Sequence, residues 1–276
     1  MLEPNIIKDE ELESLIKEIN DLYGYDFSQY SRASFKRRVN RVCLLDHFSS
    51  YAELRYMIIN NPEYLKRFIE EITVNVTEMF RDPSFFKVLR NDIFPQLGTY
   101  PLIRIWVAGC STGEEAYSIA IILKELNLYH KSLIYATDIN PKVLEKARSG
   151  IFPMHNMKLY TENYIASGGN EAFSDYYSAN YDGVLFSKSL REKMILSTHN
   201  LVSDSSFNSF QLIICRNVLI YFDKELQERV FQLFDDSLEN LGFLALGSKE
   251  TLKFSKFNTV YEQVESQKIW KKLEHY

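Results

Sequence analysis

The sequence predicts an α/β protein with a mostly parallel sheet, preceded by a small all-helical domain. Three observations support this expectation. From Ile103 onward, short apolar runs alternate with segments of helical periodicity, which is the pattern of a parallel sheet covered by helices on both faces. The residues before that point show helical periodicity without strand-like alternation. The small residues of Gly109–Gly113 separate the first apolar run from a strongly helix-forming segment.

The N-terminal region is expected to be a helical domain over residues 1–81. Asn61-Pro62 and Asp82-Pro83 each have the order of a helix cap followed by proline at the first helical position. The helix that starts at the second of these pairs is expected to end near Pro95. Residues 82–100 are therefore interpreted as a linker helix and a connection into the sheet.

The rest of the chain, residues 101–276, is expected to form the sheet domain. A long helix is predicted at Lys224–Leu241, capped by Asp223 and ended by Gly242. Other helices are predicted at Glu114–Leu126 and after Asn140-Pro141. Strands are predicted at Ile103–Ala108, Leu133–Thr137, Phe210–Cys215 and Phe243–Leu246, and a closing hairpin at Val260–Val264 and Lys268–Lys272.

Composition argues against several classes of protein. The chain has 46% apolar and 25% charged residues, and no apolar run reaches the length of a membrane span. Its net charge of −5 argues against a nucleic-acid binder. Cys43, Cys110 and Cys215 are isolated, and the histidines show no metal-ligand spacing. We therefore expect a cytoplasmic protein with no disulfide, no metal and no direct membrane insertion.

Polar segments follow three of the predicted strands. They are Gly109–Glu115, Asp138 and Arg216-Asn217, and they should converge, because parallel strands present their carboxyl ends at one edge of the sheet. The two loop glycines stand four residues apart, which is neither the G-x-G-x-x-G spacing of a dinucleotide site nor a P-loop. The loop resembles that of class I S-adenosylmethionine (SAM) methyltransferases, where glycine lets the backbone approach the ligand.

Two acidic residues have competing interpretations. Asp138 suits a carboxylate that accepts the hydroxyls of an adenosyl ribose, and a helix-cap role is disfavoured because Asn140 is better placed as a cap. Glu115 could hold the ammonium group of the methionine moiety. It could equally close a capping box with Thr112, and spacing alone leaves both interpretations open.

Positive charge is concentrated in the segment 32–41, which contains no acid. Phe35, Val39 and Val42 recur at helical spacing, so this segment is expected to be an amphipathic helix with a basic outer face. For an arbitrary chain, a solvated face is the favoured interpretation. A docking surface for an acidic partner is the functional alternative. The basic residues are Arg32, Lys36, Arg37, Arg38 and Arg41.

Five segments resemble motifs of the chemotaxis receptor methyltransferases, the CheR family. They occur in family order between about residue 30 and residue 250, and five ordered matches are far more specific than any one alone. The fullest match is Cys215–Phe222 (CRNVLIYF). The others are Asn75–Pro83 (NVTEMFRDP), Ala108–Ser118 (AGCSTGEEAYS), Ala136–Asn140 (ATDIN) and Lys146–Phe152 (KARSGIF).

The resemblance implies a class I SAM-methyltransferase fold. This is a Rossmann-like, mostly parallel sheet with an antiparallel C-terminal hairpin, a helical N-terminal domain and a small inserted subdomain at about 154–193. It also implies methyl transfer from SAM to glutamate side chains on the cytoplasmic helical domain of chemoreceptors, which gives glutamyl methyl esters and S-adenosylhomocysteine. The enzyme is expected to be a monomer. The SAM site is implied to contain Asn75, Thr77, Arg81, Gly109, Glu115, Asp138, Asn200, Leu201, Arg216 and Asn217.

The resemblance further implies that Tyr221 faces the reacting centre, so Arg81 and Tyr221 are the expected catalytic residues. It raises the docking interpretation of the basic segment above a solvated face. The sequence departs from the family pattern at Met79, where an aromatic residue is usual. It also departs at Lys249, within an LGSKE segment that resembles the family's L-G-H-S-E.

Four alternatives compete with this interpretation. Methylation of a nucleobase or amide nitrogen is disfavoured, because Cys215–Val218 replaces the Asn/Asp-Pro-Pro-aromatic motif of those enzymes. A nicotinamide enzyme is disfavoured by the loop spacing. A SAM-binding signalling module that transfers nothing stays open, although Arg81 and Tyr221 argue against it. Transfer to another protein substrate is also open.

Overall fold

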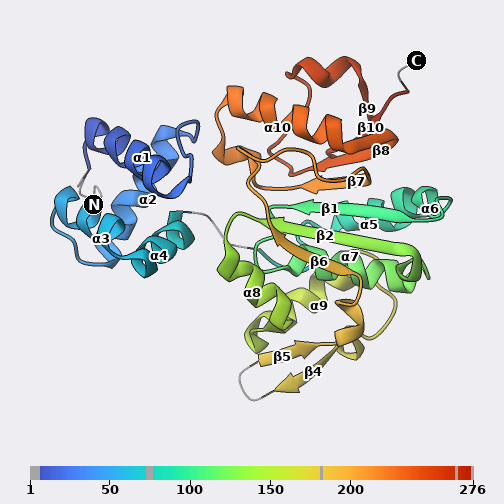
Figure 1. The fold of residues 1–276 in the computed structure, drawn as a ribbon. Coiled ribbons are helices and arrows are strands. Elements are labelled where there is room, and N and C mark those ends of the chain that lie inside the picture. The colour runs from blue at the N-terminus through green and yellow to red at the C-terminus, as the bar shows by residue number, and fades with distance from the viewer. Residues whose placement is uncertain (1–6, 73–76, 181–182, 265–266, 275–276) are drawn as a thin grey trace. The chain divides into compact units, whose positions relative to one another are not determined.

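The computed structural model describes residues 7–72, 77–180, 183–264 and 267–274. The chain divides into two compact units, each described here by itself (Figure 1). The helical unit consists of residues 1–75 and 219–230, and the sheet unit of residues 76–218 and 231–276. The boundary near residue 75 differs from the one expected at 81.

Four helices form the body of the helical unit. The polar Asn61 begins the fourth as expected, since its side-chain oxygen accepts the N–H groups of Glu63 and Tyr64 at 3.1 Å. The inner helix faces bury an apolar core that includes Ile19 and Phe68, both 0% exposed. The helices are α1 (Asp9–Tyr23), α2 (Arg32–Leu45), α3 (Tyr51–Asn60) and α4 (Pro62–Ile72).

A segment from late in the chain completes the helical unit. It contains the short turn η6 (Leu219–Tyr221) and the beginning of α10 (Lys224–Ser237). The N–H of Asp223 donates to the Gln29 carbonyl at 2.9 Å, and the ring of Phe222 packs edge-on to Tyr30. Nothing in the local sequence pattern predicts this pairing of distant segments.

The sheet unit is built on a seven-stranded sheet of order β6-β2-β1-β7-β8-β10-β9. The first five strands in this order are parallel and the last two pair antiparallel, so the predicted class I SAM-methyltransferase fold and its C-terminal hairpin are confirmed (Figure 1). The strands are β1 (Ile103–Ala108), β2 (Ser132–Asp138), β6 (Met194–Thr198), β7 (Phe210–Cys215), β8 (Leu238–Leu246), β9 (Tyr261–Val264) and β10 (Ile269–Lys272).

The residues expected to link the two domains pack inside the sheet unit. Phe86 and Phe94, for example, are fully buried in the same core as β1. The helical run passes through a π-turn and ends slightly beyond Pro95. The elements here are α5 (Pro83–Val88), η1 (Leu89–Ile93) and α6 (Phe94–Leu97), and the main sheet also carries α7 (Glu114–Glu125), η2 (Tyr129–Lys131), α8 (Pro141–Ser149) and η7 (Lys256–Thr259).

The inserted subdomain is a short helix beside a three-stranded antiparallel sheet of order β3-β5-β4 (Figure 1). Its helix α9 packs against the main core through Tyr160 and Tyr164, whose exposed fractions are 1% and 0%. Its elements are β3 (Ile151–Phe152), η3 (Met154–Asn156), α9 (Met157–Ala166), η4 (Phe173–Tyr176), β4 (Tyr177–Asn180), β5 (Gly183–Phe186) and η5 (Lys188–Leu190).

One helix end was predicted wrongly. The α10 helix stops at Ser237 rather than Leu241, because the chain enters β8 at Leu238, which pairs with Phe210. The cap at Asp223 is confirmed, since its carboxylate accepts the N–H of Leu226 at 2.9 Å. Within the described ranges, no helix has both the length and the apolarity needed to cross a membrane.

Candidate active site

The polar segments predicted to converge lie at adjacent strand ends. Strand β1 runs parallel to β2 on one side and to β7 on the other, so their carboxyl ends meet at one edge. These ends lead into Gly109–Gly113, Asp138 and Arg216-Asn217. The N–H of Gly109 donates to the Thr137 carbonyl at 2.8 Å, which joins the loop to β2. The expected convergence is confirmed.

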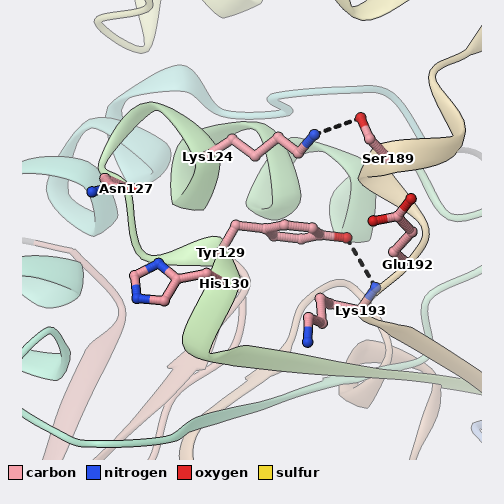
Figure 2. Close-up of a pocket in the computed structure, with 7 residues that line it drawn as sticks. All are labelled: Lys124, Asn127, Tyr129, His130, Ser189, Glu192 and Lys193. Carbon is pink, nitrogen blue, oxygen red and sulfur yellow. Dashed lines mark hydrogen bonds between the residues drawn. The ribbon is translucent and has the colours of Figure 1, made fainter.

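A pocket of about 400 Å³ lies at the opposite end of these strands (Figure 2). It is lined by residues that come just before β2 and β6. Its polar groups bind one another: the Lys124 ammonium donates to Ser189 Oγ at 2.5 Å, and the Lys193 N–H donates to the Tyr129 hydroxyl at 3.1 Å. Because it lies at the opposite end of the strands, the pocket is separate from the predicted site. Its lining residues are Lys124, Asn127, Tyr129, His130, Ser189, Glu192 and Lys193.

The glycine-rich loop needs its glycines for conformation and for space. Gly109 and Gly113 have φ values of +76° and +96°, in the region that disfavours side chains. A Cβ at Gly109 would overlap the Val218 side chain, and one at Gly113 would lie 2.8 Å from the Cβ of Ala147. Any other residue at either position would push the loop away from the strand ends that it joins.

Asp138 is buried beneath this loop, with 8% of its surface exposed. Its carboxylate accepts the N–H groups of Ser111 at 2.9 Å and Asn140 at 3.0 Å. Burial raises the pKa of the Asp138 carboxyl, although these two hydrogen bonds oppose the shift. Asn140 is the cap of α8, accepting the Lys142 N–H at 3.0 Å. The helix-cap interpretation of Asp138 is therefore excluded.

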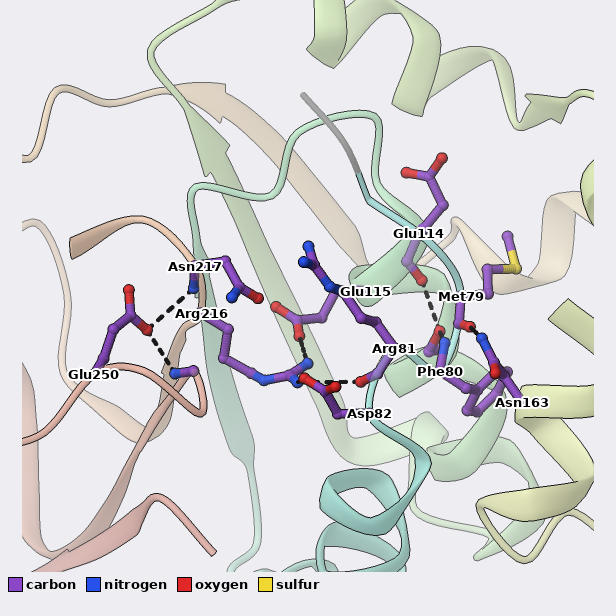
Figure 3. A network of polar contacts seen from close by, with 12 residues as sticks. Met79, Phe80, Arg81, Asp82, Glu114, Glu115, Asn163, Arg216, Asn217 and Glu250 are labelled. Atoms are coloured by element: carbon purple, nitrogen blue, oxygen red, sulfur yellow. Dashed lines mark hydrogen bonds and ion pairs between the residues drawn. The ribbon is translucent and has the colours of Figure 1, made fainter. Parts of the chain in front are cut away.

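Arg216 organises the centre of the candidate site (Figure 3). Its guanidinium makes ion pairs of 2.6 Å with Glu115 and with Asp82, and it donates to the Arg81 carbonyl at 3.1 Å. Its carbon atom Cζ lies 4.1 Å from the ring centre of Phe85. The side chain is only 3% exposed, so these charge-assisted bonds hold three segments of the chain together.

The partners of Arg216 resolve two expectations about helix caps. Helix α7 begins after Gly113 and has no side-chain cap, so Glu115 does not close a capping box. The Asp82 side chain makes no cap bond to α5, and its carboxylate pairs with Arg216 instead. Sequence reasoning missed this role of Asp82, because the Asp-Pro pair is also the usual signature of a capped helix start.

Glu250 holds the turn that follows β7. Its carboxylate accepts the N–H groups of Asn217 at 3.0 Å, Val218 at 2.9 Å and Gly247 at 2.6 Å. Glu250 is 5% exposed, and Asn217 is held at a φ of +61°. Sequence reasoning did not assign this role. The available signal was the LGSKE segment, whose glycine has no room for a side chain beside Glu250.

Two protein-family models together match most of the chain. Residues 75–270 match the model described as CheR methyltransferase, SAM binding domain. Residues 10–73 match the model described as CheR methyltransferase, all-alpha domain. The chain belongs to the CheR methyltransferase family. It is thus a SAM-dependent methyltransferase, as the sequence motifs indicated.

Individual CheR relatives cover most of the chain. A Pseudomonas putida protein with the provisional name methyltransferase Cher3 is 44% identical over 96% of this chain and 97% of its own. A chemotaxis protein methyltransferase of Borreliella burgdorferi is 32% identical over 91% of each chain. The chemotaxis protein methyltransferase of Salmonella typhimurium is 33% identical over 75% of this chain and 70% of its own.

The residues at the strand ends fit SAM. A buried carboxylate at Asp138 suits ribose hydroxyls, and Gly109 in the adjoining loop has no side chain to keep a ligand from the backbone. Among the described residues, Ser111 Oγ and Asn140 Nδ2 are buried without a hydrogen-bond partner. These two atoms are therefore available to a polar ligand at the strand ends, although other buried atoms of the described residues also lack partners.

The segment that carries Arg81 approaches the same edge. Phe80 and Asp82 have φ values of +53° and +59°, so Arg81 stands between two left-handed residues. Thr77, also expected at the CheR site, is half-buried. Asn75 lies outside the described residues.

Asn200 and Leu201 follow β6, which is the neighbour of β2 in the sheet. The Asn200 side-chain oxygen accepts the N–H of Val202 at 2.9 Å, and the backbone N–H of Asn200 donates to the Asp204 carboxylate at 2.9 Å. These bonds shape the turn after β6. Leu201 is half-buried in that turn.

Tyr221 belongs to the helical unit. Its carbonyl accepts the N–H of Ser31 at 2.9 Å, and the guanidinium of Arg38 lies 4.2 Å from its ring centre. The expected role of Tyr221 at the reacting centre stays a prediction.

The basic helix α2 differs from expectation at one residue. Arg38 does not lie on the outer face: it is 8% exposed and donates to the Ile72 carbonyl at the end of α4. The reason is that position 38 shares the inner face of the helix with Phe35 and Val42. Lys36 pairs with Asp9 at 2.6 Å and Arg32 with Glu13 at 2.5 Å, whereas Arg37 and Arg41 are exposed.

Proposed function

We propose that this methyltransferase transfers the methyl group of SAM to glutamate side chains on the cytoplasmic helical domain of bacterial chemoreceptors. The products are glutamyl methyl esters and S-adenosylhomocysteine. The proposal places the enzyme in the cytoplasm, in sensory adaptation. Relatives of CheR type that carry the name chemotaxis protein methyltransferase support this substrate class.

The observation that carries the proposal is the joining of Arg81 to the SAM-binding edge. Arg216 donates to both the Arg81 carbonyl and the Glu115 carboxylate. The backbone of Arg81 is therefore held beside the start of α7. A guanidinium is a planar, permanently charged group that binds carboxylates through two parallel hydrogen bonds. An arginine at this place suits a carboxylate substrate.

For this reaction the protein mainly has to align the substrate carboxylate with the methyl group of SAM. SAM supplies a methyl group on a positively charged sulfur. A glutamate carboxylate is ionised at neutral pH, so no general base is needed. Arg81 would orient the carboxylate without fully neutralising it, and Tyr221 would hold a reactant by a hydrogen bond. Asp138 would bind the ribose hydroxyls, and Glu115 the ammonium group of SAM.

Receptor recognition is assigned to α2. Arg37 and Arg41 are exposed on this helix, whereas Arg38 is turned inward. Exposed guanidinium groups attract acidic surfaces and orient the encounter. Arg37 and Arg41 are therefore the main docking residues of the basic segment. Arg32 and Lys36, which are already in ion pairs, add positive charge to the same helix.

The test is methyl transfer from labelled SAM to cytoplasmic fragments of the host's chemoreceptors, followed by alkaline treatment. Volatile label released by base would establish methyl esters on the receptor. Arg81→Ala should abolish most transfer while SAM binding persists, and Asp138→Ala should weaken SAM binding by about tenfold or more, because a charged hydrogen-bonding group is lost. Binding of SAM with no labelled receptor fragment would instead favour another protein substrate or a binding module without transfer.

A further inference from the structure

Arg81, just before α5, lies between two residues whose backbone conformations are rarely adopted without support from neighbouring groups. Phe80 and Asp82, on either side, both have positive φ values of +53° and +59°. Residues other than glycine avoid this region, so neighbouring groups must impose it. Identifying those groups shows which parts of the molecule determine where the Arg81 guanidinium lies.

Part of the restraint comes from the main body of the sheet unit. The N–H of Phe80 donates to Ser118 Oγ at 2.9 Å, from within α7. On the other side, Arg216 binds the Arg81 carbonyl and the Asp82 carboxylate, at 3.1 and 2.6 Å. These bonds fix the two ends of the three-residue segment.

The remaining restraint comes from α9, in the inserted subdomain (Figure 3). The side-chain amide of Asn163 donates to the Met79 carbonyl at 3.1 Å. The next residue, Tyr164, places its ring edge-on to the Phe80 ring, with 5.3 Å between centres. Phe80 is fully buried against it. The insert is therefore bonded to the backbone immediately before Arg81.

We infer that Asn163 of the inserted subdomain is a positioning residue for Arg81. The inference rests on the proposed role of Arg81 in orienting the substrate carboxylate. The Met79 carbonyl is fixed by Asn163, the Phe80 ring by Tyr164, and the peptide groups that follow carry Arg81. Without the Asn163 amide, the segment keeps its fold but loses the restraint that points Arg81 at the strand ends.

The experiment replaces the amide with a group of the same shape that cannot donate. In Asn163→Asp the kcat for methyl transfer should fall by about tenfold, since small displacements of an aligning group cost that much or more. The Kd for SAM and the KM for the receptor fragment should stay within about twofold. Hydrogen exchange at the Phe80 and Arg81 amides should accelerate by about tenfold, because the segment opens more often. Glu162→Ala, an exposed neighbour on α9, is the matched control and should match the unaltered chain in every readout.

A double variant separates positioning from general destabilisation. If Asn163 acts through Arg81, Asn163→Asp should cost little further rate in an Arg81→Ala background. Additive losses, or normal kcat and exchange in Asn163→Asp, would overturn the inference. Failure of the proposed function looks different: the unaltered chain would then label no receptor fragment, and the exchange measurement would still report on Asn163.

Discussion

Glu250 is the single residue on which the turn after β7 depends most. Its carboxylate accepts hydrogen bonds of 2.6–3.0 Å from three backbone N–H groups, those of Asn217, Val218 and Gly247. In Glu250→Gln the amide –NH₂ would face some of these donors, and buried donors would lose their acceptor. We expect the free energy of unfolding to fall by about 2–3 kcal/mol, measured by denaturant titration. Weaker SAM binding should accompany it.

Lys249 provides the control for that substitution. It is exposed beside the buried Glu250 and departs from the usual residue of the family segment. Lys249→Ala should leave both stability and SAM affinity within the range of ordinary surface substitutions, about 0.5 kcal/mol. Equal losses in the two variants would show that the loop as a whole, and not the Glu250 carboxylate, maintains the turn.

Glu114 gives a pH dependence of stability. Burial raises the pKa of its carboxyl from 4.5 to about 6. The folded state therefore holds this proton more tightly than the unfolded state. Its stabilising contribution is complete below about pH 4.5 and is lost as pH rises through 6, a difference of about 2 kcal/mol. Glu114→Gln should remove this dependence. In denaturant titrations at pH 4.5, 6 and 7.5, the free energies of unfolding of the two proteins should be most alike at pH 4.5 and diverge as pH rises, and parallel curves would contradict the assignment.

At the level of residues, the sequence identified candidate positions better than it identified their partners. Asp138 could be separated from a cap because Asn140 stood in the better place, and the structure agrees. The Glu115–Arg216 pair was not foreseen, since the two residues are far apart in sequence and only the strand order brings them together. Long-range ion pairs leave no periodic signal in a chain.

At the level of elements, α2 makes the clearest prediction. Arg37→Glu with Arg41→Glu reverses two exposed charges. The KM for receptor fragments should rise by about tenfold, with a weaker salt dependence, because steering charges act on encounter. The Kd for SAM and the kcat should not change. The measurement is methyl transfer at several salt concentrations.

The matched control reverses two exposed charges elsewhere in the helical unit. Lys17→Glu with Lys224→Glu changes net charge by the same amount on α1 and α10. If this pair raised KM as much as the α2 pair, the effect would belong to net charge and not to a docking helix. Arg38 is unsuitable for either pair, because its guanidinium is buried against Tyr221.

Element boundaries were predictable where local chemistry sets them. The caps at Asn61 and Asp223 and the closing hairpin followed from the sequence. The end of α10 did not: Leu238 continues the apolar periodicity, but pairing with Phe210 in the sheet overrides helix propensity. The π-turn at Leu89–Ile93 was likewise invisible, since no residue type marks it in this run.

At the level of the whole molecule, the sequence order of the family motifs conceals how the chain is shared between units. Residues 219–230 lie within the region matched by the SAM-binding family model, yet they pack with the helical unit. Leu226 and Val230 on this stretch are fully buried. Periodicity revealed the helix but could not show that its first residues group with the helical unit, because apolar periodicity is the same in both units.

This sharing predicts what removal of the helical unit would do. In a chain that begins at residue 77, the Asp223 N–H loses its acceptor on Gln29, and Phe222 loses the Tyr30 ring. Hydrogen exchange at Asp223 should accelerate by about a hundredfold, while the amides of β7, paired within the sheet unit on both sides, should keep their protection. Tyr221, next to Phe222 and Asp223, should become mobile together with these two residues. Methyl transfer should then fall even at saturating receptor, which loss of docking through α2 alone would not cause. Unchanged protection at Asp223 would mean that the segment 219–230 is held by the sheet unit after all.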